Sequence, residues 1–317
     1  MFIASPFRLR KSGIVGMNQR NVVLIAQNNP RRLYPLADNK LKTKELLEKA
    51  GIATPSLLGS IHSQAHIREL ESFLSHHNAF VMKPAKGSGG KGILVIKKRT
   101  GKQFIKSSGS IITSTDIKRH ASNTLSGLFS LGGNNDVVML EEMVNFSDHF
   151  DGYSYQGIPD IRIIVYKGFP ILAMTRLSTK VSDGKANLHQ GAVGVGIDIT
   201  SGDSLRAIQY GRPVLNHPDT GKDLTGFSVP EWNRFTELAS RCYEITGLGY
   251  LGVDIVLDAE KGPQILELNA RPGLAIQIAS GVGLQSRIDR IEKVLETNAG
   301  PQFETALERC AFTASEF

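Results

Sequence analysis

The spacing of apolar residues predicts alternating helices and strands in the first half of the chain. Leu41, Leu46 and Leu47 recur at helical spacing after Asp38-Asn39, either of which suits a helix cap, and Gly51 follows the expected end. The apolar period then shortens, which predicts strands over 79–83 and 92–97. The other elements expected here are a helix with Ile67, Leu70, Phe73 and Leu74 on one side, a helix over 115–131 and a strand over 137–142.

From residue 160 onwards the pattern predicts mainly strands. Residues 160–166 and 170–175 flank Lys167-Gly168, a pair that suits a tight hairpin turn. The remaining predicted elements are a strand over 191–198, a helix over 231–246, strands over 250–257 and 264–268, a helix over 284–296 and a less regular tail. Antiparallel hairpins mixed with helices favour an α+β fold over a doubly wound parallel sheet.

Length and composition indicate an ordinary globular protein. The 317 residues suggest about two domains, and 41% hydrophobic with 21% charged residues excludes wholesale disorder. The longest apolar run, 22–26, is far shorter than the roughly 20 residues that span a bilayer, so no membrane span is expected. Cys242 and Cys310 cannot form a disulfide framework, and no signal-peptide pattern opens the chain. We therefore expect a cytoplasmic protein.

The net charge of +7 is concentrated at the N-terminus. Residues 1–37 contain six Lys and Arg residues and no Asp or Glu, which leaves 31 basic and 30 acidic residues in the other 280. Such a basic arm suits an acidic protein partner, phosphates or anionic lipid. The alternatives are a solvated tail or an arm that docks on its own domain. No basic surface interleaved with aromatic residues is apparent, which argues against nucleic acid as a partner.

The segment K-P-A-K-G-S-G-G-K-G at 83–92 joins two predicted strands. Its glycines let backbone amides approach an anion, and three lysines add positive charge, so the segment predicts phosphate binding. It is not a P-loop, because it lacks the G-x-x-x-x-G-K-[ST] pattern and no helix follows. A flexible hairpin tip is the alternative, which the lysine density argues against. The ammonium of Lys83 is expected to have a partner only when phosphates are bound, so replacing it should not destabilise the protein.

Two carboxylates and an amide lie on the predicted C-terminal hairpin. On adjacent antiparallel strands Asp254 and Glu267 can face each other, and Glu267 and Asn269 project from the same face. Hard oxygen ligands without His or Cys suit magnesium held jointly with substrate phosphates. A solvated hairpin face is the alternative, which the strongly apolar flanking residues argue against. A conservative amide replacement of either carboxylate should therefore reduce activity and leave the fold intact.

The order of these motifs resembles the ATP-grasp superfamily. Lys40, the loop at 83–92, the Glu-Glu-Met-Val turn at 141–144 and the C-terminal carboxylates follow its plan. The stretches N-L-H-Q-G-A at 187–192 and E-L-N-A-R-P-G-L at 267–274 look like RimK-type alpha-L-glutamate ligases in particular. The resemblance covers about residues 38–297. It implies an α+β, ATP-grasp fold, in which two α+β subdomains clamp ATP, with a truncated N-terminal region.

The resemblance also implies a role for each matching residue. The residues expected to bind ATP are Lys40, Lys83, Gly87, Ser88, Gly89, Gly90, Glu141, Glu142, Met143, Val144, Asp160, Lys185 and Asn187. Within this set, the resemblance implies that the turn at 141–144 is a hinge whose backbone contacts adenine, and that Asp160 contacts the ribose. The residues expected to hold Mg²⁺, with Mn²⁺ as an alternative, are Asp254, Glu267 and Asn269. Arg176 and Arg271 are expected to contact the substrate carboxylate or the acyl-phosphate.

The implied division of the chain runs along these motifs. We expect a basic arm at 1–37, a helical part of the ATP-grasp core at 38–78, a lid with the glycine loop at 79–144, a core with the metal site at 145–300, and a tail at 301–317. A full RimK-type enzyme carries a complete domain before the position of Lys40, whereas 39 residues precede it here. The amino-acid-binding surface must then be rebuilt, supplied by a partner, or absent. The aromatic segment at 146–155 suits either a cover for a substrate or a dimer contact.

The activity implied is that of an ATP-dependent carboxylate–amine ligase. Such enzymes form an acyl-phosphate from ATP and a carboxylate, which an amine then attacks, and glutamate or another amino acid is a candidate for the added group. Small-molecule or peptide acids and amines are the expected substrates, and a homo-oligomer is an open alternative. The rival hypotheses are an ATP-grasp enzyme that acts on a sugar-linked or other small acceptor, and an ATP-binding scaffold with a basic docking arm.

Overall fold

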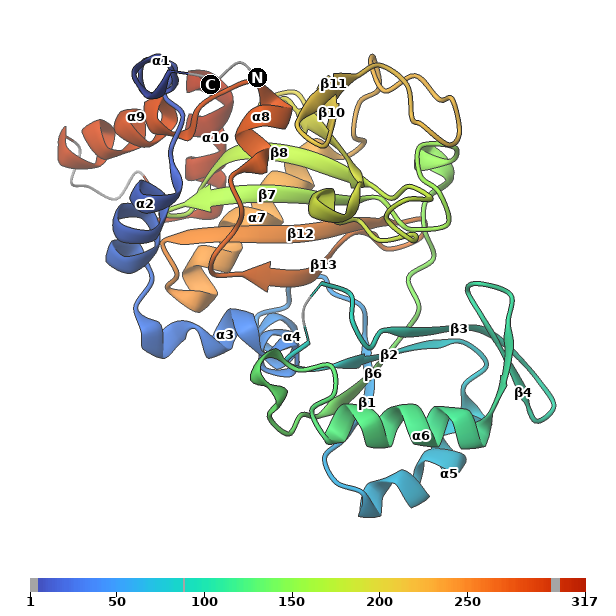
Figure 1. The fold of residues 1–317 in the computed structure, drawn as a ribbon. Coiled ribbons are helices and arrows are strands. Elements are labelled where there is room, and N and C mark those ends of the chain that lie inside the picture. Colours follow the sequence, from blue (N-terminus) through green and yellow to red (C-terminus); the bar gives the residue numbers. More distant parts are fainter. Residues whose placement is uncertain (1–4, 88, 298–302) are drawn as a thin grey trace. The chain divides into compact units, whose positions relative to one another are not determined.

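The structure, a computed structural model, describes residues 5–87, 89–297 and 303–317 (Figure 1). It divides into two compact units. We call the first, which comprises 1–37, 50–53 and 146–317, the large unit. The second, which comprises 38–49 and 54–145, is the small unit. Each unit contains its own antiparallel sheet and its own helices, in agreement with the predicted α+β class.

The small unit is built on a six-stranded sheet in the order β1-β6-β2-β3-β4-β5. Its strands are β1 (Leu57–Ile61), β2 (Phe80–Pro84), β3 (Leu94–Thr100), β4 (Gln103–Lys106), β5 (Ile111–Thr113) and β6 (Val138–Glu141). Its helices are α4 (Lys40–Lys49), η3 (Ala65–Arg68), α5 (Leu70–His76), α6 (Ser114–Leu125) and the short turn η4 (Leu131–Gly133). Fully buried side chains such as Phe80, Met82 and Ile117 join α5 and α6 to the sheet.

Local signals explain where two of these helices begin and end. The Asn39 side chain accepts hydrogen bonds from the backbone N–H groups of Leu41 and Lys42, which caps α4 as its sequence predicts. Helix α6 ends six residues before its predicted end at 131. The reason is Gly127, whose φ is +85° and where a Cβ atom would lie 2.4 Å from the carbonyl oxygen of Asn134. A left-handed glycine commonly ends a helix.

The large unit is built on a seven-stranded sheet in the order β11-β10-β9-β8-β7-β12-β13. Its strands are β7 (Asp160–Tyr166), β8 (Phe169–Leu177), β9 (Val193–Ile197), β10 (Ser204–Gln209), β11 (Arg212–Val214), β12 (Tyr250–Asp258) and β13 (Gly262–Asn269). Its helices after residue 145 are η5 (Asp148–Phe150), η6 (Leu188–Gln190), α7 (Trp232–Thr246), α8 (Ala275–Ser280), α9 (Leu284–Thr297) and α10 (Ala306–Glu316). Helices α7 and α8 lie on opposite faces of the sheet (Figure 1). The β7–β8 hairpin turns as predicted, because Lys167 and Gly168 both have positive φ angles, of 47° and 88°.

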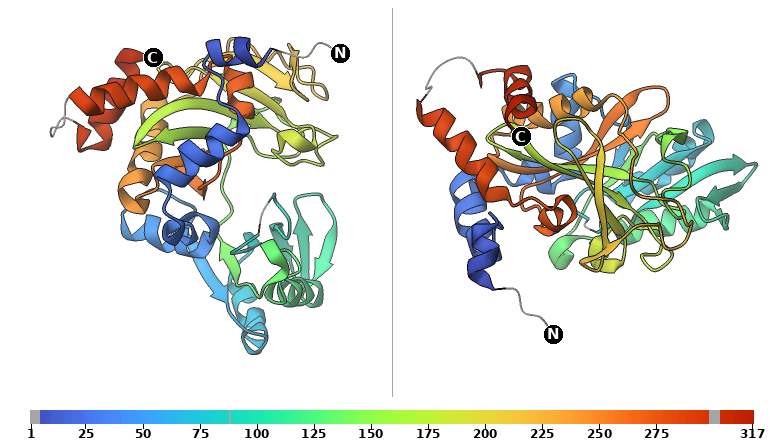
Figure 2. Two further views of the ribbon diagram at one scale, coloured as in Figure 1. Left: turned by 60° about the vertical axis from the view of Figure 1, so that its left-hand side comes forward. Right: turned by 90° about the horizontal axis from the view of Figure 1, so that it is seen from above.

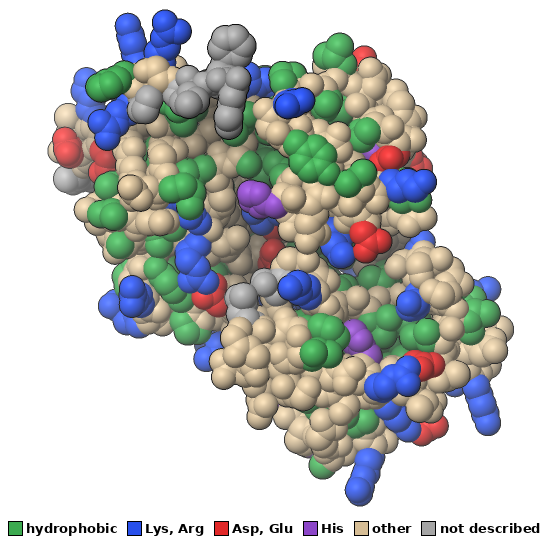
Figure 3. All heavy atoms as spheres, in the orientation of Figure 1, with side chains coloured by type: hydrophobic (Ala, Val, Ile, Leu, Met, Phe, Trp, Pro, Cys, Tyr) green, Lys and Arg blue, Asp and Glu red, His purple; other side chains and the backbone are tan. Residues whose placement is uncertain are grey.

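The basic arm packs on the large unit. It forms α1 (Pro6–Lys11), α2 (Met17–Gln19), η1 (Arg20–Ala26), η2 (Arg31–Leu33) and α3 (Pro35–Asp38), the last ending at the start of the small unit. Val15, Leu24 and Ile25 are buried among residues of β7, β8 and α9, and the arm runs beside α9 (Figure 2). Of the predicted alternatives, the structure therefore supports an arm docked on its own domain. Three of its exposed basic residues, Arg8, Arg10 and Lys11, lie on α1, and Figure 3 shows Lys and Arg side chains gathered at that end of the molecule.

The tail forms a regular helix that the apolar pattern alone does not reveal. Helix α10 begins at a capping box, in which the side chain of Thr305 accepts from the N–H of Glu308 and the carboxylate of Glu308 accepts from the N–H of Thr305. It packs on α7 and β8. Among the described residues, no helix is both long and apolar enough to cross a membrane.

Candidate active site

Four neighbouring strands of the large unit bring five charged side chains together. Asp254 on β12 lies directly opposite Arg162 on β7 and, on its other side, opposite Glu267 on β13, as the hairpin pattern predicts. Asp160, at the start of β7, lies opposite Arg176 on β8. We call these five residues the carboxylate–arginine cluster. Directly opposed residues share a face of a sheet, and so do alternate residues of one strand, so all five project from the same face.

The guanidinium groups hold the carboxylates in fixed positions. Arg162 donates from Nε to Oδ1 of Asp254 and from a terminal nitrogen to Oδ2, both at 2.6 Å. Arg176 donates from Nε to Oδ1 of Asp160 at 2.6 Å, contacts Oδ2 of Asp160, and reaches Oδ2 of Asp254 at 2.7 Å. Asp254 is only 1% exposed. Bidentate pairing of this kind fixes both distance and orientation, and it is stronger than a neutral hydrogen bond.

Burial and pairing act in opposite directions on these carboxyl groups. Burial raises the pKa of Asp254, but the guanidinium groups of Arg162 and Arg176 outweigh it and hold that pKa well below its ordinary value. For Asp160, burial outweighs the pairing with Arg176, and the neighbouring Asp254 adds to it, so its pKa rises to about 6. The cluster therefore holds Asp254 as a carboxylate throughout the physiological pH range.

Arg162 is not among the site residues predicted from the sequence. The signal was present in Asp160-Ile161-Arg162, because period 2 places an arginine beside a carboxylate within an otherwise apolar strand. In the structure, the guanidinium groups of Arg162 and Arg176 both pair with Asp254. Arg176, which was predicted to contact the substrate, also pairs with Asp160.

The three predicted magnesium ligands occupy one end of the β12–β13 hairpin. Asn269 lies opposite Gly252, two residues along from the Asp254–Glu267 pair, and its Oδ1 accepts from the N–H of Arg271 at 2.8 Å. Among the described residues, no three His, Cys, Asp or Glu side chains come together as a metal cage. Two carboxylates and one amide oxygen still fit Mg²⁺, which commonly binds one or two protein carboxylates and completes its shell with water and phosphate oxygens.

In the small unit, one carboxylate lies between two lysines. Glu141 on β6 contacts the Nζ atom of Lys83 on β2 at 2.6 Å and that of Lys44 on α4 at 3.0 Å. All three side chains are buried. We call them the lysine–glutamate cluster. Burial lowers the pKa of Lys44 to about 8, although Glu141 opposes this shift. The expectation that Lys83 has no partner without phosphates is wrong, because Glu141 binds it.

The glycine loop is attached to the same region. Lys40 donates from Nζ to the carbonyl oxygen of Gly87 at 2.9 Å, and the N–H of Lys86 donates to the carboxylate of Asp136. Gly89 and Gly90 have positive φ angles, and no described atom lies within 4 Å of a Cβ built on either. An anion can therefore approach the backbone there. Ser88, predicted to bind ATP, lies outside the described residues.

The predicted hinge continues from β6. The backbone N–H of Glu142 donates to the carbonyl of Ser56, and the hydroxyl of Ser56 donates to the carboxylate of Glu142 at 3.0 Å. Met143 is half-buried and Val144 is buried. The side chain of Glu141 belongs to the lysine–glutamate cluster, so it holds lysines in addition to any contact that its backbone makes. The adenine contact itself stays a prediction.

Lys185 and Asn187 lie between β8 and β9. Lys185 pairs with Asp183 at 3.1 Å, and the side chain of Asn187 caps η6 by accepting from the N–H of His189. Gly194 lies opposite Arg176, and a Cβ there would be 2.9 Å from Leu188. The segment that follows Asn187 therefore covers the sheet beside the carboxylate–arginine cluster. Arg271, after β13, stacks its guanidinium group over the ring of Tyr34 at 4.9 Å.

A family model and several curated proteins match most of this chain. The family model described as "Sugar-transfer associated ATP-grasp" matches residues 19–293. The "Probable alpha-L-glutamate ligase" of Pseudomonas entomophila (strain L48) is 24% identical over 278 residues, which cover 85% of this chain and 69% of that protein. The protein of the same name from Citrobacter koseri is 26% identical over 268 residues, which cover 84% and 66%.

Solved structures of ligases also align with the chain. ATP-grasp ligase PsnB complexed with minimal precursor is 15% identical with a TM-score of 0.44, and the alignment covers 84% of this chain and 63% of PsnB. D-alanine–D-alanine ligase from Bacillus anthracis complexed with ATP is 14% identical with the same TM-score, and covers 84% and 68%. This chain thus spans less than two thirds of the length of PsnB.

Proposed function

This chain belongs to the sugar-transfer associated ATP-grasp family, and on that premise we propose that it joins a carboxylic acid to an amine at the expense of ATP. In the proposed first step, a carboxylate oxygen of the acid attacks the γ-phosphorus and ADP leaves, which forms an acyl-phosphate. In the second step the amine nitrogen attacks the acyl carbon, phosphate leaves, and the nitrogen loses a proton. The product is an amide.

The predicted ATP-grasp fold is confirmed by the family match, and the curated relatives support an ATP-dependent ligase as the class of enzyme. The acyl-phosphate route, the substrates and the role of each site residue are proposals. These proposals rest mainly on the carboxylate–arginine cluster, in which two arginines fix Asp254 opposite Glu267 on one face of the sheet.

The cluster suits phosphoryl transfer because that reaction depends on positioning and on charge neutralisation more than on a protein nucleophile. Glu267, Asn269 and Asp254 would hold Mg²⁺, which would neutralise the negative charge of the phosphates. Arg162 and Arg176 compensate the charge of Asp254, so that Glu267 does not face an uncompensated buried carboxylate. Preorganised charges of this kind need no rearrangement during the reaction.

The small unit offers the features that suit a triphosphate. Lys40 and Lys83 would supply positive charge, and the open backbone at Gly89 and Gly90 would donate N–H groups to phosphate oxygens. Glu141 holds Lys83 in place through a buried ion pair. In this proposal the lysine–glutamate cluster positions an ammonium, and the glycine loop adapts to the phosphates.

A direct test measures ADP release and product formation by the purified chain. ATP and Mg²⁺ should give ADP release that requires both an acid and an amine, and mass spectrometry of a reaction with pooled amino acids and peptides should find a condensed product. Glu267→Gln should reduce the rate at least about 100-fold, in line with the loss of a catalytic electrostatic contact. The matched control is Glu296→Gln, an exposed position on α9. ADP release without any added acid, at a rate equal to that with acid and amine, would contradict the ligase.

The family description favours a second candidate, an acceptor that is linked to a sugar. The same chemistry then forms an amide on an amino sugar or on a sugar acid. Adding amino sugars and uronic acids to the pooled substrates distinguishes the two candidates. A condensed product that contains a sugar supports the second, and a product that contains only amino acids supports the first.

A further inference from the structure

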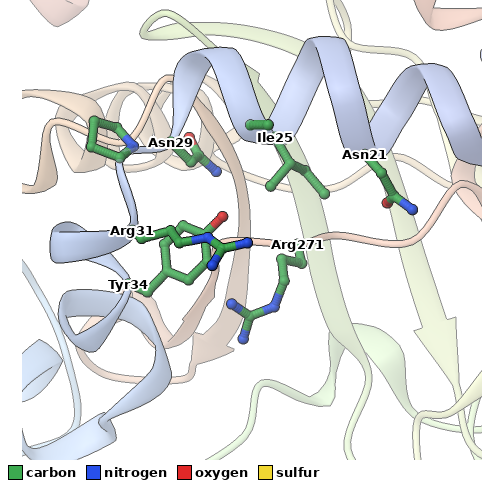
Figure 4. Close-up of a pocket in the computed structure, with 8 residues that line it drawn as sticks. Asn21, Ile25, Asn29, Arg31, Tyr34 and Arg271 are labelled. Atoms are coloured by element: carbon green, nitrogen blue, oxygen red, sulfur yellow. The ribbon is translucent and has the colours of Figure 1, made fainter.

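A pocket of about 360 Å³ lies between the arm and the segment that follows β13 (Figure 4). All of its lining residues belong to the large unit, and seven of the eight come from the arm. The lining consists of Asn21, Ile25, Ala26, Asn29, Pro30, Arg31, Tyr34 and Arg271. This volume lies near the lower end of the range for small-molecule sites, which suits a ligand of about the size of one amino acid or one sugar.

Buried hydrogen bonds fix the arm around this pocket. Asn29 is 1% exposed, and its amide nitrogen donates to the carbonyl oxygens of Tyr250 and Ala270 at 2.7 and 2.8 Å, while its oxygen accepts from the N–H of Tyr250. Arg20 donates to the carbonyl oxygens of Arg271 and Pro272. The arm is thus bonded to the chain on both sides of Arg271, and the pocket is a built feature of the large unit.

The lining combines two cations with an apolar wall. Figure 4 shows Arg31, Tyr34 and Arg271 gathered at one side of the pocket, with Ile25 and Asn21 along η1. The guanidinium group of Arg271 stacks on Tyr34, which sets its plane. Arg31 is exposed, and within the part of the chain that the structure describes no carboxylate pairs with it. Planar guanidinium groups favour bidentate partners such as carboxylates.

Arg271, which lines the pocket, follows the proposed metal ligand Asn269 by two residues. The N–H of Arg271 donates to Oδ1 of Asn269, so the residue that lines the pocket is bonded to the end of the β12–β13 hairpin. The arm lies on the same sheet face as the carboxylate–arginine cluster. Leu24 and Ile25 of the arm pack with Ile164 and Tyr166. These two residues follow Asp160 and Arg162 at every second position along β7, so all four side chains project from one face.

We propose that this pocket binds the acid substrate, a small organic acid whose carboxylate pairs with Arg31 and whose aliphatic part contacts Ile25 and Pro30. This inference rests on the proposed function, and it names the substrate class and a specificity-determining residue outside the family's shared motifs.

Direct binding tests the pocket without requiring catalysis. Ligand-observed NMR on the full chain, in the absence of ATP, would use a pool of L-amino acids, dicarboxylates, D-glucuronate and D-galacturonate at millimolar concentration. Neutral amides and sugars serve as uncharged probes. We expect at least one carboxylate to bind, with an affinity that Arg31→Gln weakens by at least about tenfold, because a hydrogen-bonded charge pair is lost. The matched control is Arg32→Gln, the adjacent exposed arginine, which does not line the pocket.

The possible results of this binding experiment distinguish a failure of the pocket proposal from a failure of the ligase proposal. An acid that binds the wild type and Arg32→Gln but not Arg31→Gln supports the pocket, even if no amide is ever formed. Equal binding to both variants, or no carboxylate that depends on Arg31, overturns it, even if the chain proves to be a ligase. Where turnover is measurable, Arg31→Gln should raise KM for the acid and leave KM for ATP unchanged. An amino acid or a uronic acid as the bound member identifies the class of acid.

Discussion

The carboxylate–arginine cluster and the lysine–glutamate cluster bury charge in different ways. In the first, two planar guanidinium groups share two aspartates, and Asp254 accepts from both. In the second, a single carboxylate, that of Glu141, serves two ammonium groups. Arginine keeps its charge at any physiological pH, whereas a buried lysine readily loses its proton. The pKa of Lys44, lowered to about 8 by burial, shows this difference directly.

This difference in titration behaviour suits the two clusters to different tasks. The arginine cluster fixes a set of charges that cannot titrate away, which suits a site where phosphate charge must be compensated at every turnover. The lysine cluster carries a net positive charge beside a glycine loop with open backbone, which suits a site that adapts to an arriving polyanion.

Asp254→Asn should have the largest effect, and we expect it to destabilise the fold, which the sequence alone predicts to stay intact, because Asp254 pairs with two arginines. The change removes the carboxylate that pairs with Arg162 and leaves Arg176 paired with Asp160, and breaking a buried ion pair costs about 3–5 kcal/mol. Urea unfolding should therefore show a loss of that size together with the loss of activity. Glu267→Gln, at a half-buried position, should lose activity with a change in unfolding free energy of under about 1 kcal/mol. Equal unfolding free energies for wild type and Asp254→Asn would show that the arginines do not depend on this carboxylate.

Alkaline pH should stabilise the protein through Lys44. Its pKa is about 8 in the folded state and 10.5 when unperturbed, so between these values the unfolded state binds the extra proton and stability rises with pH. The gain should be about 3 kcal/mol at most, fully developed above pH 10.5 and absent below pH 8. The measurement is the unfolding free energy of wild type minus that of Lys44→Met at several pH values, which cancels the titration of other groups. A flat difference across this window would contradict the lowered pKa.

Lys83→Met should have a smaller effect on stability than Asp254→Asn and a clear effect on nucleotide binding. Glu141 keeps Lys44 as a partner, so we expect a loss of about 1–3 kcal/mol on unfolding in place of the neutral result that the sequence suggests. ATP affinity by calorimetry should fall at least about tenfold. The control is Lys97→Met, an exposed lysine on the neighbouring β3. If ATP bound both variants equally well, Lys83 would have no role beyond holding Glu141.

Local signals predicted much of this architecture. The Asn39 cap, the Lys167-Gly168 turn and the pairing of Asp254 with Glu267 each depend on a few neighbouring residues or on a hairpin, so the sequence is sufficient to place them. The capping box at Thr305 was an available signal for α10 that the apolar pattern alone does not reveal.

The remaining features depend on contacts between distant segments. Lys44 and Glu141 are far apart in sequence, so no local pattern links them. The same holds for Asn29, whose partners Tyr250 and Ala270 lie in the last third of the chain. The net charge of the arm indicated possible partners but gave no information about its apolar contacts. From the sequence alone, Leu24 and Ile25 could equally belong to a short exposed apolar run, whereas the structure buries them. Residue types indicated the chemistry, and tertiary contacts determined which charges meet.

The most direct test of nucleotide binding at the small unit is amide hydrogen exchange with and without a non-hydrolysable ATP analogue and Mg²⁺. If the lysines and the glycine loop hold the phosphates, and the segment after β6 contacts adenine, exchange should slow markedly over residues 83–92 and 141–144. Peptides from α10, which contains none of the proposed nucleotide ligands, serve as the internal control. Slower exchange in those two segments, with unchanged exchange in α10, is the predicted result. Equal exchange in both segments at saturating nucleotide would contradict the nucleotide site and, with it, the ATP-dependent ligase.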